Sequence, residues 1–306
     1  MKLNFSLLAK HSYQRPVISE HYILEENGIK SQDGNIELKF DDPEELDTFR
    51  KVFFDRDFSF IDQMEEILDL MATNGMIREE ASALGKSWVD VCHDLFHEMN
   101  SEMASQNQND NFVRKIVEAR ASIPEIIEWL KRSFYYTRSA FTHISGVVEN
   151  KLLIADEKKF WEEFRADEMH HWKIYSKLFE FLKVDLEGLK NSANHPAVED
   201  YVNYLHATGQ ESMYQYAALL YMMEKIPDAE ELADDPLYGP LLTHYHFPEE
   251  TILPLWNHTN YNGENAHNDI WFNILRSRAV YSGDEVQRIL ERAREHCRLC
   301  YVWNRC

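Results

Sequence analysis

The chain has few residues that break helices and few that could cross-link it. Only 10 glycines and 9 prolines occur among 306 residues, so long helices can form with few forced interruptions. The four cysteines, at positions 92, 297, 300 and 306, are too few for a dense disulfide framework. No second cysteine pair or suitably spaced histidine completes a zinc site around them. We therefore expect reduced thiols and a cytoplasmic protein.

Long apolar runs and an excess of positive charge are also missing. No segment is apolar enough for a signal peptide or a membrane span, so we expect no membrane partner. The 53 acidic residues outnumber the 32 basic ones and give a net charge of −21. Such a field repels phosphate backbones, which argues against nucleic-acid binding.

Helical periodicity covers most of the sequence, so the predicted fold class is all-α. Residues 1–40 are expected to form an irregular arm with a short hairpin. Pro124 should begin or kink a helix, and "EKIPDAEEL" should end another. Helices are expected near 43–72, 78–105, 111–150, 157–184, 197–226, 247–261, 264–278 and 283–303.

The segment "IPEIIEWLKRSFYYTRSAFTHISGVV" (123–148) is apolar on more than one face. A helix that is apolar nearly all round is packed by several neighbours, so this segment is expected at the centre of the fold. His143 then faces the interior, either as a ligand or as an ordinary core histidine with a hydrogen-bond partner.

A glutamate and a histidine interrupt an otherwise apolar helical stripe. Glu168 and His171 follow Trp161 and Phe164 on that stripe, at positions where the pattern calls for apolar side chains. Burying ionisable groups costs several kcal/mol unless something compensates them. The E-x-x-H spacing is how helical bundles present ligands to iron or manganese. The alternative is a buried Glu–His hydrogen bond.

Three more segments carry similar groups. Glu224 continues the apolar stripe of its helix, and Glu264 with His267 forms a second E-x-x-H preceded by His258. Alternatively, Glu224 reaches solvent at a helix end and His258 is a capping or surface histidine. This mixture of carboxylates and imidazoles suits a pair of iron or manganese ions better than catalytic zinc.

A histidine pair elsewhere is less informative. His93 and His97 in "CHDLFHE" have i, i+4 spacing, which suits a metal, but no third ligand is evident nearby in the sequence. We interpret them as part of a polar helix face.

Four segments together resemble the haem-oxygenase-like dimetal oxidases, relatives in fold of thiaminase-II and pyrroloquinoline-quinone synthase. They are "WLKRSFYYTRSAF", "FRADEMHHWKIYSKLFEFLKVD", "YMMEKIP" and "LPLWNHTNYNGENAHNDIWFNIL". The resemblance implies a bundle of about seven core helices over residues 80–306. Residues 1–79 would be an N-terminal arm and extension helix.

The resemblance also implies a ligand set. Glu168, His171 and Glu224 match the family pattern, which ends in an H-x3-D-x2-H helix. Here Asn262 stands four residues after His258, and Glu264–His267 comes two residues late. A helix interruption at Asn262–Gly263 would make His258, Glu264 and His267 ligands; without it the second metal lacks ligands. Asn262 and His143 are additional candidates.

The function implied by the resemblance is O2 activation at a pair of Fe(II) ions, with manganese as a substitute. The substrate would be a small amine, amino acid or fatty acid of specialised biosynthesis, undergoing N-oxygenation, desaturation or oxidative C–C cleavage. Phe141, Trp172, Tyr221 and Trp271 are expected to wall the substrate pocket and exclude water. Aromatic residues at helical spacing are equally common as plain core residues.

The sequence also leaves other functional classes of protein open. A ferritin-like di-iron N-oxygenase needs a carboxylate from the preceding helix, where the chain offers His143 and Glu149. A metal-free thiaminase-II-like hydrolase needs a nucleophilic cysteine in the pocket, and Cys92 lies outside the segments expected there. A haem oxygenase with His93 or His97 as proximal ligand leaves the carboxylates unexplained, as does a non-enzymatic helical adaptor. The sequence also leaves open whether the protein forms a homodimer.

Overall fold

The computed structural model describes residues 3–80, 85–107, 112–224, 229, 231–264 and 267–303. Within these ranges it does not describe the side chains of residues 107, 259–264, 268 and 303. The chain forms two compact units. Unit 1 comprises Met1–Leu8, Ser101–Ile274 and Glu291–Cys306, and unit 2 comprises Ala9–Asn100 and Leu275–Leu290. A domain boundary at residues 79/80 stays a prediction.

Unit 2 combines short antiparallel strands with helices. Strands β2, β3 and β4 form a three-stranded sheet, β1 pairs with β5, and β6 pairs with β7. The hairpin predicted in residues 1–40 is therefore confirmed. The elements are β1 (Pro16–Ile18), β2 (Tyr22–Glu25), β3 (Gly28–Ser31), β4 (Glu37–Lys39), α1 (Pro43–Phe53), η2 (Phe58–Met64), α2 (Glu65–Thr73), β5 (Ile77–Glu79), β6 (Lys86–Ser87) and β7 (Val280–Tyr281).

Two long helices, α3 (Trp88–Asn107) and α15 (Gly283–Trp303), each have residues in both units. Helix α3 belongs to unit 2 as far as Asn100, and α15 belongs to it as far as Leu290. Within unit 2, buried Arg276 forms ion pairs with Glu65 and Asp69 of α2.

All regular elements in the described residues of unit 1 are helices, as predicted. It also contains the remainders of α3 and α15, and α14 extends beyond Ile274 into unit 2. Its other elements are η1 (Phe5–Leu7), α4 (Phe112–Val117), α5 (Ile123–Arg138), α6 (Ala140–Val148), α7 (Ala155–Glu168), η3 (His171–Tyr175), α8 (Ser176–Phe181), α9 (Leu186–Asn191), α10 (Pro196–Glu211), α11 (Met213–Met223), η4 (Leu232–Asp234), α12 (Tyr238–Thr243), α13 (Glu249–Glu264), η5 (His267–Asp269) and α14 (Ile270–Arg276).

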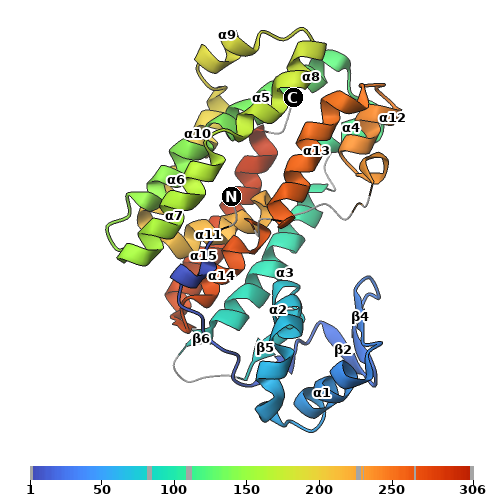
Figure 1. Ribbon diagram of the computed structural model, residues 1–306, viewed down its shortest axis with the longest axis vertical. Coiled ribbons are helices and arrows are strands. Elements are labelled where there is room, and N and C mark those ends of the chain that lie inside the picture. The colour runs from blue at the N-terminus through green and yellow to red at the C-terminus, as the bar shows by residue number, and fades with distance from the viewer. Residues whose placement is uncertain are drawn as a thin grey trace. The chain divides into compact units, whose positions relative to one another are not determined.

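Helix α6 packs against both α7 and α10 (Figure 1). The approach to α10 is close because glycines lie at the contact on both helices. A Cβ on Gly146 would lie 2.1 Å from the backbone oxygen of His206, and one on Gly209 would lie 2.8 Å from the backbone nitrogen of Val147. Glycine is therefore required at both positions.

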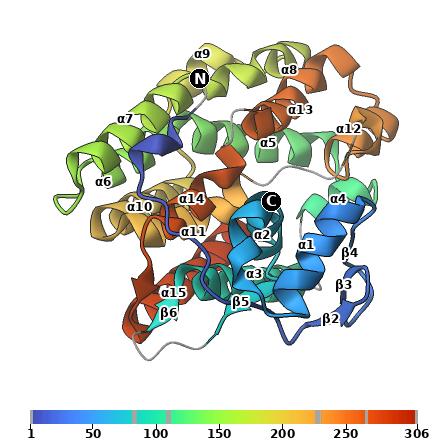
Figure 2. The same ribbon diagram turned by 60° about the horizontal axis from the view of Figure 1, so that its bottom comes forward.

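Several predicted helices are shorter than their apolar patterns. The stretch 111–150 contains α4, α5 and α6, and Pro124 lies in the first turn of α5 as predicted. Figure 2 shows α7 and α8 as separate helices, since α7 ends at Glu168. Of the helices in the described part of the chain, none is both long and apolar enough to cross a bilayer.

Candidate metal centre

The junction between α7 and η3 carries the first predicted pair. Glu168 is the last residue of α7, and its helix face buries Trp161 and Phe164. A turn at residues 169–170 follows, and η3 begins at His171. The predicted single helix over 157–184 is therefore wrong, but the turn keeps the pair together: Glu168 Oε2 lies 2.7 Å from His171 Nδ1.

His258 of α13 joins this pair. Its Nε2 lies 2.9 Å from the same Nδ1 of His171. A proton on His171 Nδ1 can be directed at the Glu168 carboxylate or at the imidazole of His258, but one N–H cannot serve both well. A cation among these three atoms would satisfy all of them at once, because each can offer it a lone pair.

His267 of η5 forms a second group with two adjacent carboxylates. Its Nε2 lies 3.2 Å from Asp167 Oδ2, and its Nδ1 lies 3.3 Å from Glu168 Oε1. The His267 ring is fully buried. Glu168 thus takes part in both groups, with Oε2 beside His171 and Oε1 beside His267.

The charges within these groups are strongly coupled. Burial alone would raise the pKa of Glu168, but the hydrogen bond from His171 and the nearby imidazole of His267 outweigh it and lower the pKa. Burial would lower the pKa of His267, yet Asp167 and Glu168 raise it. In both cases a carboxylate and an imidazole that lie close together stabilise each other's charged form.

Glu224 lies close to these groups without belonging to either. It follows the last residue of α11 as the C-terminal cap and is only 9% exposed, so the alternative of a solvent-reaching glutamate is wrong. Burial and the negative charge of Glu168 raise the pKa of Glu224. It lines a cavity together with Glu168 and His258.

His143 lines the same cavity but is held differently. Its Nδ1 lies 2.7 Å from the Tyr216 hydroxyl, and its ring stacks on that of Tyr136. Its Nε2 is buried without a hydrogen-bond partner in the described part of the chain. The closely spaced groups above do not include it, so a ligand role for His143 stays a prediction.

Two predicted ligands cannot be placed. The side chains of Asn262 and Glu264 lie outside the described residues. The backbone of α13 is helical through Glu264, and η5 begins at His267. A helix break at Asn262–Gly263 is therefore wrong, since α13 continues to Glu264, and a bulge there stays a prediction.

Asp167 is absent from the ligands predicted from sequence. Its neighbour Glu168 lies on the apolar stripe of the predicted helix. Because the side chains of adjacent helical residues point in directions about 100° apart, Asp167 was not expected on the same face. Both residues nevertheless lie against His267, because its ring presents Nε2 to Asp167 and Nδ1 to Glu168. The only sequence signal was one acidic residue directly before E-x-x-H, which is common on exposed helices.

The cavity has a volume of about 250 Å³. Its lining includes the tyrosines Tyr136, Tyr175 and Tyr238 and the apolar residues Ile144 and Leu255. None of the four predicted wall residues, Phe141, Trp172, Tyr221 and Trp271, is among its lining residues.

The four aromatic residues have other surroundings. Phe141 is 38% exposed beside Arg165, and Trp172 lies against Phe134. Tyr221 and Trp271 contact each other, with ring centroids 5.1 Å apart. Periodicity showed which helix faces were apolar, but it could not show which faces border a cavity.

Comparison with known proteins supports the fold and leaves the activity open. No protein-family model matches the chain, and no curated protein matches its sequence. A domain of unknown function with a haem oxygenase-like fold from Shewanella denitrificans OS217 has a TM-score of 0.59 at 14% identity, covering 69% of this chain and 89% of that one. A TenA homolog from Pseudomonas syringae pv. tomato DC3000 has a TM-score of 0.53 at 12% identity, covering 74% and 96%. The chain therefore has the predicted haem-oxygenase-like fold.

Proposed function

We propose that this protein is a non-haem dimetal oxidase that activates O2 to oxidise a small amine or amino acid. The observation that carries the proposal is the position of Glu168. Each of its two carboxylate oxygens faces a different histidine, which is the arrangement expected of a carboxylate shared by two ions.

The donor set fits a pair of iron or manganese ions. Glu168, His171 and His258 would hold one ion, and Asp167, Glu168 and His267 the other. Glu224 is close enough to both groups to interact electrostatically with Glu168 and His267, so it is a further carboxylate for the pair. Mixed carboxylate and imidazole donors suit iron and manganese. When bound, two Fe(II) ions supply two electrons to O2.

The chain's own residues select and enclose the substrate. At about 250 Å³ the cavity lies at the small end of ligand sites, which favours an amine or amino acid over a fatty acid. Tyr136, Tyr175 and Tyr238 offer hydroxyls to orient a polar substrate. Ile144, Leu220 and other apolar side chains keep bulk water from the reacting groups.

An anaerobic Fe(II) titration followed by O2 consumption tests the proposal. We expect about two equivalents bound by the wild type and by Glu162→Ala, a matched control on the exposed side of α7. Glu168→Ala should lose both equivalents and the Fe(II)-dependent uptake of O2. Unchanged stoichiometry in Glu168→Ala would refute the dimetal assignment.

The similarity to a TenA homolog favours one other candidate, a metal-free hydrolase that uses a cysteine nucleophile. The described cysteines do not support it. Cys92 is fully buried, its pKa is raised by burial, and neither Cys297 nor Cys300 lines the cavity. Hydrolysis of thiamine by chelator-treated protein, abolished by a thiol alkylating reagent, would favour the hydrolase over the oxidase.

A further inference from the structure

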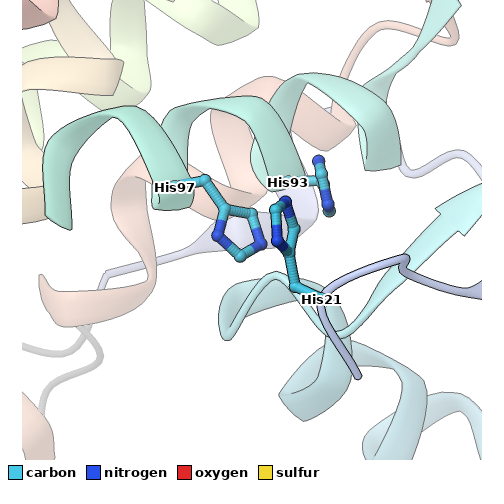
Figure 3. A group of neighbouring side chains, drawn as sticks. All are labelled: His21, His93 and His97. Carbon is cyan, nitrogen blue, oxygen red and sulfur yellow. The ribbon is translucent and has the colours of Figure 1, made fainter. Parts of the chain in front are cut away.

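Three histidine side chains meet in unit 2, apart from the candidate metal centre. His93 and His97 are one turn apart on α3 and therefore share a face of that helix. His21, just before β2, reaches the same face, and Figure 3 shows the three rings gathered beside α3. The ring centroid of His97 lies 4.1 Å from that of His21 and 4.5 Å from that of His93.

The three rings are close enough to share an ion. One nitrogen from each histidine lies within 4.8 Å of the other two. Zn–N bonds of about 2.0–2.1 Å hold the nitrogens of a tetrahedral site roughly 3.4 Å apart. A shift of at most about 1.4 Å is therefore needed, and His21 is exposed, so its ring can rotate to supply it.

The two helix histidines already have the outer contacts that metal-binding histidines use. His97 Nε2 lies 3.2 Å from the backbone oxygen of Gly75, which leaves Nδ1 for a ligand. His93 Nδ1 lies 3.2 Å from the Asp94 carboxylate, which leaves Nε2. A carbonyl or carboxylate on the second ring nitrogen fixes the tautomer and strengthens the imidazole as a donor. The Ser19 hydroxyl, 2.8 Å from His93 Nε2, would have to turn away when an ion binds.

We propose that His21, His93 and His97 bind a zinc ion. Three imidazoles are a donor set for zinc or a neighbouring first-row ion, not for calcium or magnesium. The sequence showed only the i, i+4 pair, because His21 is remote along the chain. Such an ion would fasten the segment before β2 to α3 and so stabilise unit 2.

Calorimetric titration of the apo-protein with Zn²⁺ tests this site separately from the dimetal centre. His21→Ala removes an exposed side chain, so the variant should fold like the wild type. It should bind one Zn²⁺ equivalent fewer, or bind that equivalent at least about 100-fold more weakly. Losing a residue that only contacts a metal ligand lowers the metal affinity by about 10–100-fold, so a larger loss identifies His21 as a ligand. His21→Cys restores a zinc ligand and should retain the equivalent. His244→Ala, at an exposed histidine in unit 1, should behave as the wild type.

Two further measurements test the proposed zinc site. Glu168→Ala should keep the equivalent that His21→Ala loses, because Glu168 belongs to unit 1. Zn²⁺ should raise the unfolding temperature of the wild type and lose that effect in His97→Ala. The proposal is overturned if wild type, His21→Ala and His97→Ala bind Zn²⁺ with the same stoichiometry and affinity.

Discussion

Replacing Gly146 with alanine should destabilise unit 1 by pushing α6 away from α10. The added Cβ would lie 2.1 Å from the backbone oxygen of His206, whereas ordinary van der Waals contact begins at 3.4 Å. Because the obstacle is backbone, no side-chain rotation relieves it, and the helices must separate locally by about 1.3 Å, the difference between these distances. Over-packing of this kind costs about 1–3 kcal/mol and occasionally more.

Helix propensity opposes this cost only in part. Alanine is preferred over glycine within a helix by about 1 kcal/mol. Because the clash with His206 involves rigid backbone, we take the over-packing cost at or above the top of its range. The expected net loss is about 2 kcal/mol, which lowers the folded-to-unfolded ratio roughly 30-fold. Urea unfolding followed by circular dichroism measures it as a lower midpoint at unchanged slope.

Gly283→Ala provides the matched control. Gly283 begins α15, and a Cβ there meets no atom within 4 Å, so this substitution should be neutral or slightly stabilising. If Gly146→Ala unfolds at the same urea concentration as the wild type and Gly283→Ala, the close approach of α6 and α10 is wrong.

Two other substitutions give separate expectations. Arg276→Met should lower the free energy of unfolding of unit 2 by about 1–3 kcal/mol, because it removes the buried guanidinium that donates hydrogen bonds to Asp69 and Glu65; equal urea midpoints for variant and wild type would contradict this. Asp167→Asn should bind about one Fe(II) equivalent fewer in anaerobic titration, because only the group containing His267 loses a carboxylate; retention of both equivalents would exclude Asp167 as a ligand.

The sequence was most informative where polar groups interrupted apolar stripes. Burial of Glu168, Glu224 and His267 could be predicted because each occupies a position where its helix faces the core, and charged groups are costly there without a partner. His258 could be paired with them only through the family resemblance, since no local pattern reveals which distant helices meet.

What could not be predicted depends on where helices end. The short break at Ser139 between α5 and α6 separates two apolar patterns that read as one helix, and Phe141 just after it is partly exposed. The sequence likewise could not show that His267 of η5 reaches Asp167 as well as Glu168. A change of one residue in a helix boundary rotates the following side chain by about 100°, and boundaries are the least certain part of a sequence-based prediction.

Anomalous X-ray diffraction at the iron edge, from anaerobic crystals loaded with Fe(II), tests the central claim most directly. Two iron positions should flank the carboxylate of Glu168, one bonded to His171 and His258 and the other to Asp167 and His267. A single iron at these residues, or none despite saturating Fe(II), would contradict the account.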